Sequence, residues 1–285
     1  KRLVEILGEK EAEQYLASNN AIVPTTVQTN TMKTEPKKLE NALQAAGAEV
    51  TPHPWLEGCF EVSGTGDLER MELFRDGMFT VQDAAARLVS TVAQCGEEDN
   101  VLDVCAAPGG KSFAIAIDRN DHGKIISCDI HPHKLKLIEK GAERLGLTSI
   151  TTALADGREE HTAWVGAADV VVADVPCSGL GIIRKKPDIR YKKAEELANL
   201  PAIQRDILHN ASRYVRDGGT LVYSTCTVLP EENEEVVAWF LENHPKFTLS
   251  PFELPHPLGK CEGMLTLWPH RHGTDGFFIC RMVKE

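Results

Sequence analysis

Short apolar runs alternate with longer helix-like segments through most of this chain, from about residue 83 onward. The runs that suit β-strands are 101–105, 124–128, 150–154, 169–173 and 220–224. The segments that suit helices are 112–119, 133–145, 194–215 and 233–243. Neighbouring parallel strands need a long crossover, usually a helix, so this alternation predicts an α/β fold built on a parallel sheet.

The amino-terminal quarter follows a different pattern. Residues 1–18 suit a helix, and after a break come a strand at 25–31, a helix at 37–46 and a strand at 55–62. Glycines and aspartates then punctuate the chain up to residue 77. We therefore expect an N-terminal helix and linker (1–18), a small α+β module (19–75) and a main domain (76–285). Within the main domain, 264–268 and 277–283 could pair as an antiparallel hairpin.

The composition is that of an ordinary globular protein, with 42% apolar and 26% charged residues in a chain of 285. No run of about 18 apolar residues predicts a membrane span, and the amino end has no signal-peptide core, so we expect a cytoplasmic protein without a membrane partner. The eight cysteines are scattered, with no Cys-x-x-Cys or Cys/His cluster. This spacing predicts neither a metal site nor a disulfide framework.

The net charge of −11 counts mildly against a polyanionic partner, because affinity for nucleic acid rests largely on neutralisation of phosphates by Lys and Arg. The charge is unevenly distributed, however. Segment 184–193 reads RKKPDIRYKK, whereas segment 231–235 reads EENEE. The chain could thus carry a basic binding site on an acidic body, and the alternative for the basic segment is a solvated loop.

A glycine-rich loop joins the first predicted strand to the helix after it, with the sequence DVCAAPGGKS from Asp103 to Ser112. Glycines let backbone amides approach a ligand, and the amino end of a helix favours polar or anionic groups. The spacing is neither Gly-x-Gly-x-x-Gly nor that of a P-loop, which disfavours a nicotinamide or ATP site. The alternative is a plain tight turn. The residues expected to contact a ligand are Cys105, Ala106, Ala107, Pro108, Gly109, Gly110 and Lys111.

Two further acidic residues follow the next two strands. Asp129 comes after the second strand, where a carboxylate can accept both ribose hydroxyls of an adenosine-containing ligand. Asp156 comes after the third, where it could accept from an adenine amino group. Taken singly, Asp129 could be a helix cap and Asp156 part of a turn. The glycine-rich loop and both carboxylates nevertheless fall at one edge of the predicted sheet, which favours a shared binding site.

Two cysteines follow the fourth and fifth strands. Cys177 lies in the sequence DVPCSG that begins at Asp174, and Cys226 lies in the sequence STCT. Singly, each cysteine is more often a small buried hydrophobic residue. As a pair on neighbouring strand ends beside Asp174, they are better explained as reactive groups, and chemistry alone does not choose which of the two is the nucleophile.

Four sequence motifs occur here in the order that is typical of the Sun/Fmu/Nop family of RNA 5-methylcytosine methyltransferases. They are DVCAAPGGK (103–111), DVPCSGLG (174–181), STCT (224–227) and DGFF (275–278). Further matches at 82–85, 184–190 and 229–233 extend the resemblance from about residue 20 to the end. Within the family, the chain looks most similar to the branch of bacterial 16S rRNA (cytosine-C5) methyltransferase B.

The resemblance implies a Rossmann-like class I methyltransferase domain with a mostly parallel seven-stranded sheet, preceded by a small α+β RNA-binding module. It implies S-adenosyl-L-methionine as cofactor, held by the loop of Cys105–Lys111 together with Asp129, Asp156 and Asp174. It also implies that Cys226 attacks carbon 6 of a cytosine while Cys177 assists release of the methylated RNA. DNA cytosine methyltransferases instead use the Pro-Cys cysteine as nucleophile, so this order rests on the resemblance.

The implied reaction explains why such residues are needed. Carbon 5 of cytosine is too weakly nucleophilic to accept a methyl group unaided, and a thiolate adding to carbon 6 makes it enamine-like. Charge then builds at nitrogen 3, where Asp174 could donate a hydrogen bond if an apolar site or proton sharing with the base keeps it protonated. A proton must afterwards leave carbon 5, and Cys177 could help at that step.

The remaining expectations concern partners. The cations of 184–193 could hold the RNA backbone beside an extruded cytosine, with Tyr191 as a stacking surface. Members of the methyltransferase B branch usually carry a NusB-like helical domain, and we expect that this sequence lacks it. We also expect a monomer that acts on 16S rRNA. The alternatives are a relative acting on tRNA or 23S rRNA, another Rossmann-like methyltransferase, or a non-catalytic rRNA-binding assembly factor. The sequence does not name the target nucleotide.

Overall fold

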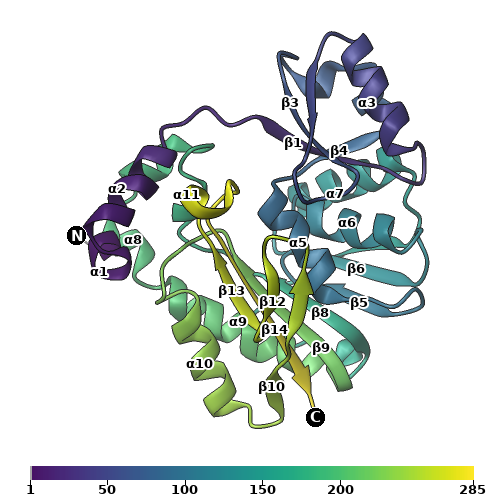
Figure 1. The fold of residues 1–285 in the computed structure, drawn as a ribbon. Helices are drawn as coiled ribbons and strands as arrows, with labels where there is room; N and C mark the ends of the chain where they lie inside the picture. The colour runs from purple at the N-terminus through teal and green to yellow at the C-terminus, as the bar shows by residue number, and fades with distance from the viewer. Residues whose placement is uncertain (1) are drawn as a thin grey trace.

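Eight strands form the main sheet in the computed structural model, which describes residues 2–285 (Figure 1). They are β5 (Asn100–Asp103), β6 (Lys124–Asp129), β7 (Ile150–Leu154), β8 (Ala168–Asp174), β9 (Val215–Thr225), β10 (Phe247–Leu249), β13 (Met264–Leu267) and β14 (Phe277–Lys284). Their order is β10-β14-β9-β8-β5-β6-β7, and β13 pairs with β14 off this path. All five strands expected from the apolar runs are present.

Strands β5 to β9 are parallel to one another, whereas β14 is antiparallel to each of its neighbours β9, β10 and β13. The expected mostly parallel sheet is confirmed, and it has eight strands rather than seven because the predicted hairpin of β13 and β14 adds one off the main path. Strands β8 and β9 stay in register up to Asp174 opposite Ser224. The carboxyl ends of these two strands therefore lie side by side.

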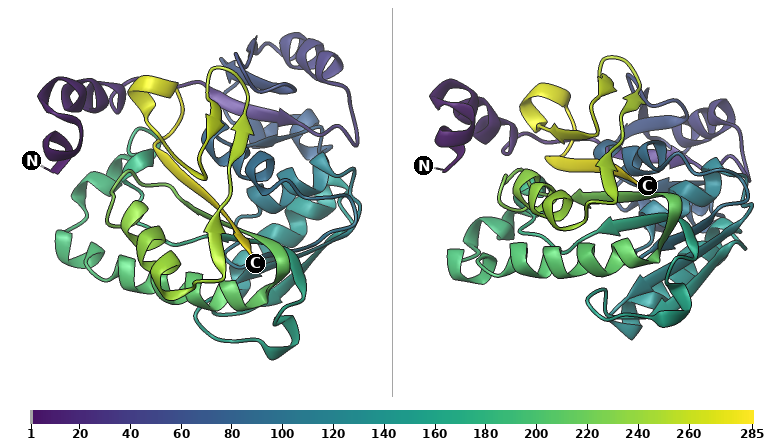
Figure 2. Two further views of the ribbon diagram at one scale, coloured as in Figure 1. Left: turned by 60° about the horizontal axis from the view of Figure 1, so that its bottom comes forward. Right: turned by 90° about the horizontal axis from the view of Figure 1, so that it is seen from below.

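Helices cover both faces of this sheet (Figure 2). Helices α5 (Ala84–Ala93), α6 (Gly110–Asp118) and α7 (Pro132–Leu145) pack on one face, and α9 (Leu200–Tyr214) and α10 (Glu234–Asn243) pack on the other. Successive strand residues point to opposite faces, so Val101 belongs to the first hydrophobic cluster and Leu102 to the second. Burial of both faces is the usual condition of parallel strands.

A smaller antiparallel sheet precedes the main one, with helix α3 (Pro36–Ala45) packed on it through Leu39 and Leu43. Its strands, in the order β2-β3-β1-β4, are β1 (Thr25–Thr29), β2 (Glu49–Pro52), β3 (Cys59–Ser63) and β4 (Phe79–Val81). The expected small α+β module is confirmed. Strand β4 lies beyond residue 75, where the sequence pattern places the end of the module, and the domain boundaries remain predictions.

The small module is fastened to the carboxyl end of α7. The side-chain amide of Asn30 donates to the backbone oxygens of Gly77 and Leu145, both at 2.8 Å. Lys33 donates to the backbone oxygen of Arg144 at 2.7 Å. The last carbonyls of a helix have no partner within the helix, so donors from the small module satisfy those of α7 and fix its place on the main domain.

Two helices rather than one occupy the amino end, α1 (Arg2–Leu7) and α2 (Glu9–Ser18), because the backbone turns at Gly8 with φ 76°. They lie beside α11 (Pro269–His272), on the other side of the molecule from the small sheet (Figure 1). The Tyr15 hydroxyl donates to the backbone oxygen of Leu180 at 2.7 Å, and its ring packs against Trp268. The amino-terminal segment is therefore packed on the main domain.

Shorter elements complete the chain. They are α4 (Glu72–Arg75), α8 (Ala194–Leu197), β11 (Phe252–Leu254), β12 (Gly259–Cys261) and the 3-10 turns η1 (Leu68–Arg70), η2 (Thr162–Trp164), η3 (Leu180–Ile182) and η4 (Pro187–Tyr191). The helix expected at 194–215 is thus divided between α8 and α9. Within residues 2–285, no helix has the length and apolar character needed to cross a membrane, and no group of three potential ligands is arranged to hold a metal.

Candidate active site

A cavity of about 480 Å³ opens at the carboxyl ends of the parallel strands. In open α/β sheets this edge is where ligands bind. The cavity is lined by several of the residues singled out in the sequence, namely Cys105, Ala107, Asp129, Asp156, Asp174, Cys177 and Cys226. The structure thus brings the glycine-rich loop, the acidic residues and both cysteines to one place.

The residues of the glycine-rich loop face in different directions. Cys105 and Ala107 line the cavity, whereas Ala106 is buried. Pro108 and Gly110 border a second cleft, of about 770 Å³, between the small module and helices α6 and α7. Of the seven loop residues expected to contact a ligand, Cys105 and Ala107 line the first cavity.

Two features hold this loop in shape. Gly109 has φ 111°, and a Cβ atom there would lie 2.4 Å from the ring of Phe113, so only glycine fits. The buried carboxylate of Asp103 accepts a hydrogen bond of 2.8 Å from Ser112, which ties the end of β5 to the start of α6. Burial raises the pKa of Asp103 to about 7, against the opposing effect of this hydrogen bond.

The two acidic residues on the far side of the cavity already have partners. Asp129 accepts from the backbone N–H of His131 at 2.9 Å, and the Lys134 ammonium lies 3.7 Å from its other oxygen. Asp156 accepts from Arg158 through Nε at 3.0 Å and Nη2 at 2.6 Å, and these hydrogen bonds lower its pKa. Asp156 also accepts from the backbone N–H of Arg158 at 2.9 Å. A carboxylate can accept about four hydrogen bonds, so Asp129 retains capacity for a ligand, whereas Asp156 would have to give up a contact with Arg158, and the roles of both stay predictions.

The cavity also has apolar walls. Ile130 after β6 and both Ile203 and Ile207 of α9 line it. A Cβ atom at Gly157 would lie 3.3 Å from Ile207 and 3.7 Å from the sulfur of Cys105, so this glycine keeps the space between them open. Apolar walls next to two carboxylates suit a ligand that carries an aromatic base and a pair of hydroxyls. The residues present therefore fit an adenosine-containing group.

The two cysteines meet at the other end of the cavity, where their sulfur atoms lie 3.2 Å apart. Cys177 follows β8 and Cys226 follows β9. The backbone oxygen of Cys226 accepts from the N–H of Gly181 at 3.0 Å, and a Cβ atom at Gly181 would lie 1.9 Å from the backbone oxygen of Gly276. These glycines let three backbone segments meet at the two thiols.

The surroundings push the pKa values of the two thiols apart. The hydrogen bond from Cys177 lowers the pKa of Cys226, and the nearby Lys111 ammonium lowers it further against the effects of burial and Asp174. The same hydrogen bond, together with burial, raises the pKa of Cys177 well above its ordinary value. Cys226 is thus the thiol that ionises first.

Lys111 and Asp174 form an ion pair beside the thiols, with Nζ 2.6 Å from the carboxylate. The other carboxylate oxygen of Asp174 accepts from the hydroxyl of Ser224 at 2.7 Å. Burial alone would lower the pKa of Lys111, but Asp174 outweighs it and the pKa is raised. Asp174 thus accepts from an ammonium and a hydroxyl, so donation by this residue would require a proton shared with a bound base.

Residues 90–283 match the sequence family of the 16S rRNA methyltransferase RsmB/F. The chain belongs to this family. Residues 1–69 match the ferredoxin-like domain of RsmF/B-like methyltransferases, which agrees with the small antiparallel sheet and α3.

Individual members of the RsmB/F family align over nearly the whole chain. A Bacillus subtilis protein named "Probable ribosomal RNA small subunit methyltransferase B" is 39% identical over 283 residues, which are 96% of this chain and 63% of the relative. Ribosomal RNA small subunit methyltransferase F of Klebsiella pneumoniae is 30% identical, covering 95% of this chain and 60% of its own. The crystal structure of PH0851 superposes with a TM-score of 0.94 at 31% identity, over 99% of this chain and 64% of that one. The chain thus spans a little under two thirds of each of these proteins.

Several residues of this RsmB/F cavity were missed by reasoning from the sequence. Ile203 and Ile207 are four positions apart on α9, a spacing that also describes any helix facing a hydrophobic core. Ile130 and Arg158 each follow an expected acidic residue by one or two positions, and nothing in the residue types signals that they line the same cavity.

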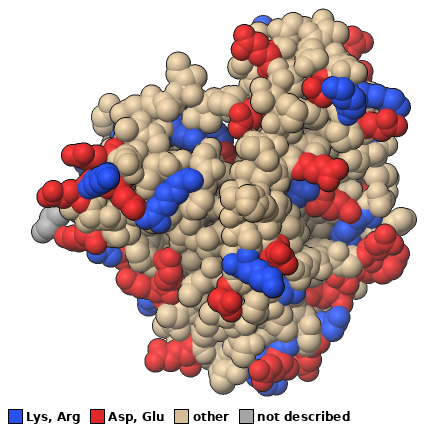
Figure 3. Space-filling model, viewed as in Figure 1, with Lys and Arg blue, Asp and Glu red and all other residues tan. Residues whose placement is uncertain are grey.

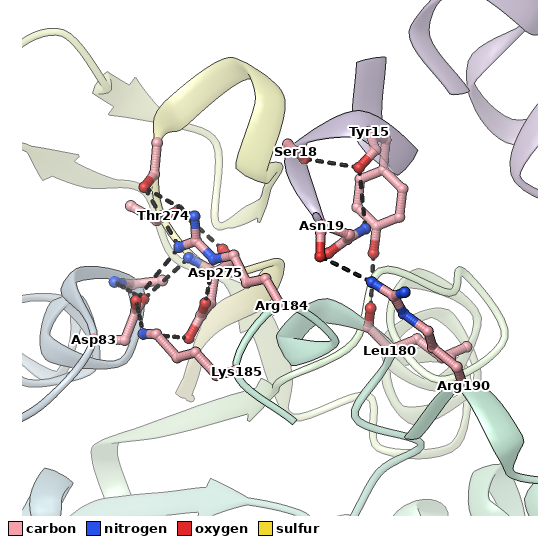
Figure 4. Close-up of polar contacts among 12 residues, drawn as sticks. Tyr15, Ser18, Asn19, Asp83, Leu180, Arg184, Lys185, Arg190, Thr274 and Asp275 are labelled. Carbon is pink, nitrogen blue, oxygen red and sulfur yellow. Dashed lines mark hydrogen bonds and ion pairs between the residues drawn. The ribbon is translucent and has the colours of Figure 1, made fainter. Parts of the chain in front are cut away.

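Two cations of the basic segment 184–193, which could hold an RNA backbone or form a solvated loop, instead have partners within the protein (Figure 4). The guanidinium of Arg184 is only 5% exposed and donates to Asp275 at 2.8 Å. Lys185 donates to Asp83 at 2.6 Å and to Asp275 at 2.9 Å. These two cations are neutralised inside the protein, whereas the ring of Tyr191 is 84% exposed, as a stacking surface requires.

Charge on the outer surface is mostly acidic at the edges. Figure 3 shows acidic side chains along the lower and outer edges of one face, with basic side chains in small groups among them. This distribution agrees with the net charge of −11. Attraction to an RNA would therefore depend on a few local cations rather than on the charge of the whole protein.

Proposed function

We propose that this chain methylates carbon 5 of a cytosine in 16S rRNA through a covalent adduct of Cys226, with S-adenosylmethionine as methyl donor. The observation that carries the proposal is the pair of thiols, 3.2 Å apart with opposite pKa shifts, on the wall of a cavity that fits an adenosine group. The family and the names of its members support 16S rRNA as the substrate.

S-adenosylmethionine, when bound, supplies an electrophilic methyl group. The apolar walls from Ile130 and Ile207 would take the adenine, and Asp129 would accept from the ribose. Asp156 would accept from the adenine amino group, with Arg158 keeping its carboxylate oriented. Of the glycine-rich loop, Cys105 and Ala107 would contact the ligand directly, and Asp174 would border its reactive end.

The target cytosine must leave its stack to reach these thiols, as in other enzymes that modify bases. The Cys226 thiolate then adds to carbon 6, which turns carbon 5 into an enamine-like nucleophile. The ammonium of Lys111 lies beside the thiols, where it can stabilise negative charge that develops on the ring, and Asp174 would do so only through a proton shared with the base. The positive charge of Lys111 also favours the thiolate before attack.

After methyl transfer, the proton on carbon 5 must leave so that the bond between Cys226 and carbon 6 can break. Cys177 is placed to assist, because its sulfur lies within hydrogen-bonding distance of the sulfur that must depart. Cys177 therefore acts in release rather than in attack.

The proposal is tested with purified protein, transcribed 16S rRNA and tritium-labelled S-adenosylmethionine, with bisulfite sequencing to locate the product. We expect Cys226→Ala to abolish methylation. We expect Cys177→Ala to accumulate a protein–RNA adduct that survives denaturing gel electrophoresis, because attack continues while release slows. Cys95→Ala, at a cysteine that does not line the cavity, serves as control. Methylation of cytosine by Cys226→Ala would disprove the mechanism.

A further inference from the structure

The two thiols compete for one proton, and charged neighbours help to decide which of them holds it. Their mutual hydrogen bond is the largest cause of both pKa shifts, and Asp174 raises the pKa of both thiols. Asp174 therefore acts on both thiols in the same direction. Lys111 lowers the pKa of Cys226, and Glu232 raises the pKa of Cys177. Glu232 has no part in the reaction described so far.

The carboxylate of Glu232 accepts a hydrogen bond from the backbone next to Cys177. Glu232 is 2% exposed, and one of its oxygens accepts from the N–H of Ser178 at 2.9 Å. The same oxygen accepts from the side-chain amide of Gln204 at 2.8 Å, and that amide also donates to the backbone oxygen of Pro176 at 3.1 Å. The residues on both sides of Cys177 are thus held by one pair of buried side chains.

A further hydrogen bond connects Ser178 to the segment that carries Cys226. The hydroxyl of Ser178 donates to the hydroxyl of Thr227 at 2.8 Å, and Thr227 is the residue after Cys226. Both hydroxyls are fully buried. The network from Glu232 through Ser178 to Thr227 therefore fixes the separation of the two sulfur atoms.

Hydrogen bonding alone does not explain a carboxylate at position 232. A glutamine would offer an acceptor oxygen of the same reach to Ser178 and Gln204 without the cost of burying a charge. The second oxygen of Glu232 has no hydrogen-bond partner among the residues described, which adds to that cost. The negative charge itself is therefore the feature that needs a function.

We propose that Glu232 is a positioning residue that keeps the proton on Cys177 and thereby makes Cys226 the nucleophile. The other ionisable neighbours do not do this. The phenol of Tyr223, which donates to the backbone oxygen of Glu232 at 2.6 Å, stays neutral because burial raises its pKa well above the ordinary value. The ammonium of Lys192 reaches the backbone oxygen of Ser178 at 2.9 Å, and its positive charge acts in the opposite sense.

The role of this charge in catalysis rests on the proposed function. In that reaction Cys226 is the thiolate during attack, and Cys177 becomes the thiolate that acts as base during release. When Cys226 bonds to carbon 6 its negative charge is lost, and with it the largest cause of the raised pKa of Cys177. Cys177 can then lose its own proton to solvent and accept the proton from carbon 5. The electrons of the carbon 5–hydrogen bond re-form the ring double bond as the bond to Cys226 breaks, which restores the thiolate.

The first test needs neither RNA nor cofactor. The free protein is alkylated with iodoacetamide over a range of pH, and each cysteine is quantified by peptide mass spectrometry, because the thiolate is the reactive form. We expect Cys226 of the unaltered protein to react about tenfold or more faster than Cys177 near neutral pH. In Glu232→Gln this ratio falls to about threefold or less, because Cys177 ionises at lower pH. An unchanged ratio in folded Glu232→Gln overturns the proposal.

Two further variants sharpen this test. Glu235→Gln removes the same charge from an exposed position three residues away and should leave the ratio unchanged. Gln204→Met removes the hydrogen bonds to Glu232 and to Pro176 but keeps the charge of Glu232, so the ratio should stay within about threefold of that of the unaltered protein. If Glu232→Gln does not fold, Gln204→Met decides alone, and a ratio that falls in it to about threefold or less overturns the proposal, because the charge is still present.

A kinetic measurement separates this inference from the proposed function. In methylation of 16S rRNA transcripts, we expect Glu232→Gln to lower kcat by about tenfold with little change in KM for RNA, because the charge acts on the thiols and not on RNA binding. A changed KM with unchanged kcat would contradict a role in thiol ionisation. If the unaltered protein methylates no RNA while the alkylation ratios behave as expected, only the proposed function fails.

Discussion

Asp103 ends β5 with a carboxyl group that is fully buried, and burial raises its pKa to about 7. In the unfolded chain the same carboxyl ionises near its ordinary value of about 4. Between these two values the unfolded chain releases the proton while the folded protein keeps it. The contribution of this group to stability is therefore fully present below about pH 4 and is lost as the pH rises through about 7.

Asp103→Asn removes this titration and retains an oxygen that can accept from Ser112. We expect the melting temperature of the variant, relative to the unaltered protein, to rise by a few degrees between about pH 5 and pH 7.5, corresponding to ~1–3 kcal/mol. Differential scanning calorimetry at several pH values measures this. The exposed residue change Asp217→Asn is the control, and a difference that does not vary with pH in Asp103→Asn would contradict the expectation.

Single residues at strand ends could be placed from the sequence, because the carboxyl ends of parallel strands meet at one edge of the sheet. Asp174, Cys177 and Cys226 are gathered in this way. The partners of Arg184 and Lys185 could not be placed. Their hydrogen bonds reach residues 91 and 102 positions away in the sequence, and such pairings depend on how whole elements pack.

Two separate sets of contacts with other elements hold the basic segment 184–193, which follows Cys177 in the sequence (Figure 4). At one end, Arg184 and Lys185 bind Asp83, which caps α5, and Asp275, which precedes β14. At the other, Arg190 donates to the backbone oxygen of Asn19 at 2.9 Å. The helices α1 and α2 therefore support the same segment that the main domain holds.

Asp275→Asn tests the first of these contacts. It leaves the buried side chain of Arg184 and the partly exposed Lys185 with one fewer negative partner, so we expect a loss of ~1–3 kcal/mol in the free energy of unfolding. We also expect faster tryptic cleavage after Arg184 and Lys185, because the segment opens more often. Urea denaturation and timed proteolysis measure the two effects. Asp188→Asn changes an exposed carboxylate of η4 in the same segment and should alter neither.

Elements with strong periodicity were easier to predict than short ones. The five parallel strands follow from apolar runs, whereas β2 and β4 have four and three residues and owe their pairing to the neighbouring strands. The helix expected at 194–215 is divided, with Pro201 in the first turn of α9, where its missing N–H removes no helical hydrogen bond. Local propensity alone does not decide such breaks.

The placement of the small module on the main domain is a property of the whole molecule, and Gly77 lies at its closest point. Gly77 has φ 74°, and a Cβ atom there would lie 2.0 Å from the backbone oxygen of Arg144 at the end of α7. Gly47 has a similar φ of 89°, and a Cβ atom there would meet nothing within 4 Å. A side chain would be strained at either position, and the two glycines differ in this contact.

Gly47→Ala should therefore cost ~1 kcal/mol of unfolding free energy, which is the strain of a left-handed alanine. Gly77→Ala adds a steric overlap that is relieved only if the small module moves away from α7, so we expect a loss of ~3 kcal/mol or more. If the small module helps to bind RNA, this movement also weakens binding of a 16S rRNA transcript about tenfold. The Kd for S-adenosylmethionine should stay unchanged, because the cavity proposed to bind it lies in the main domain. Urea denaturation, fluorescence anisotropy and calorimetric titration measure these three quantities. Equal effects of the two substitutions on stability and RNA affinity would show that contact with α7 does not set the position of the small module.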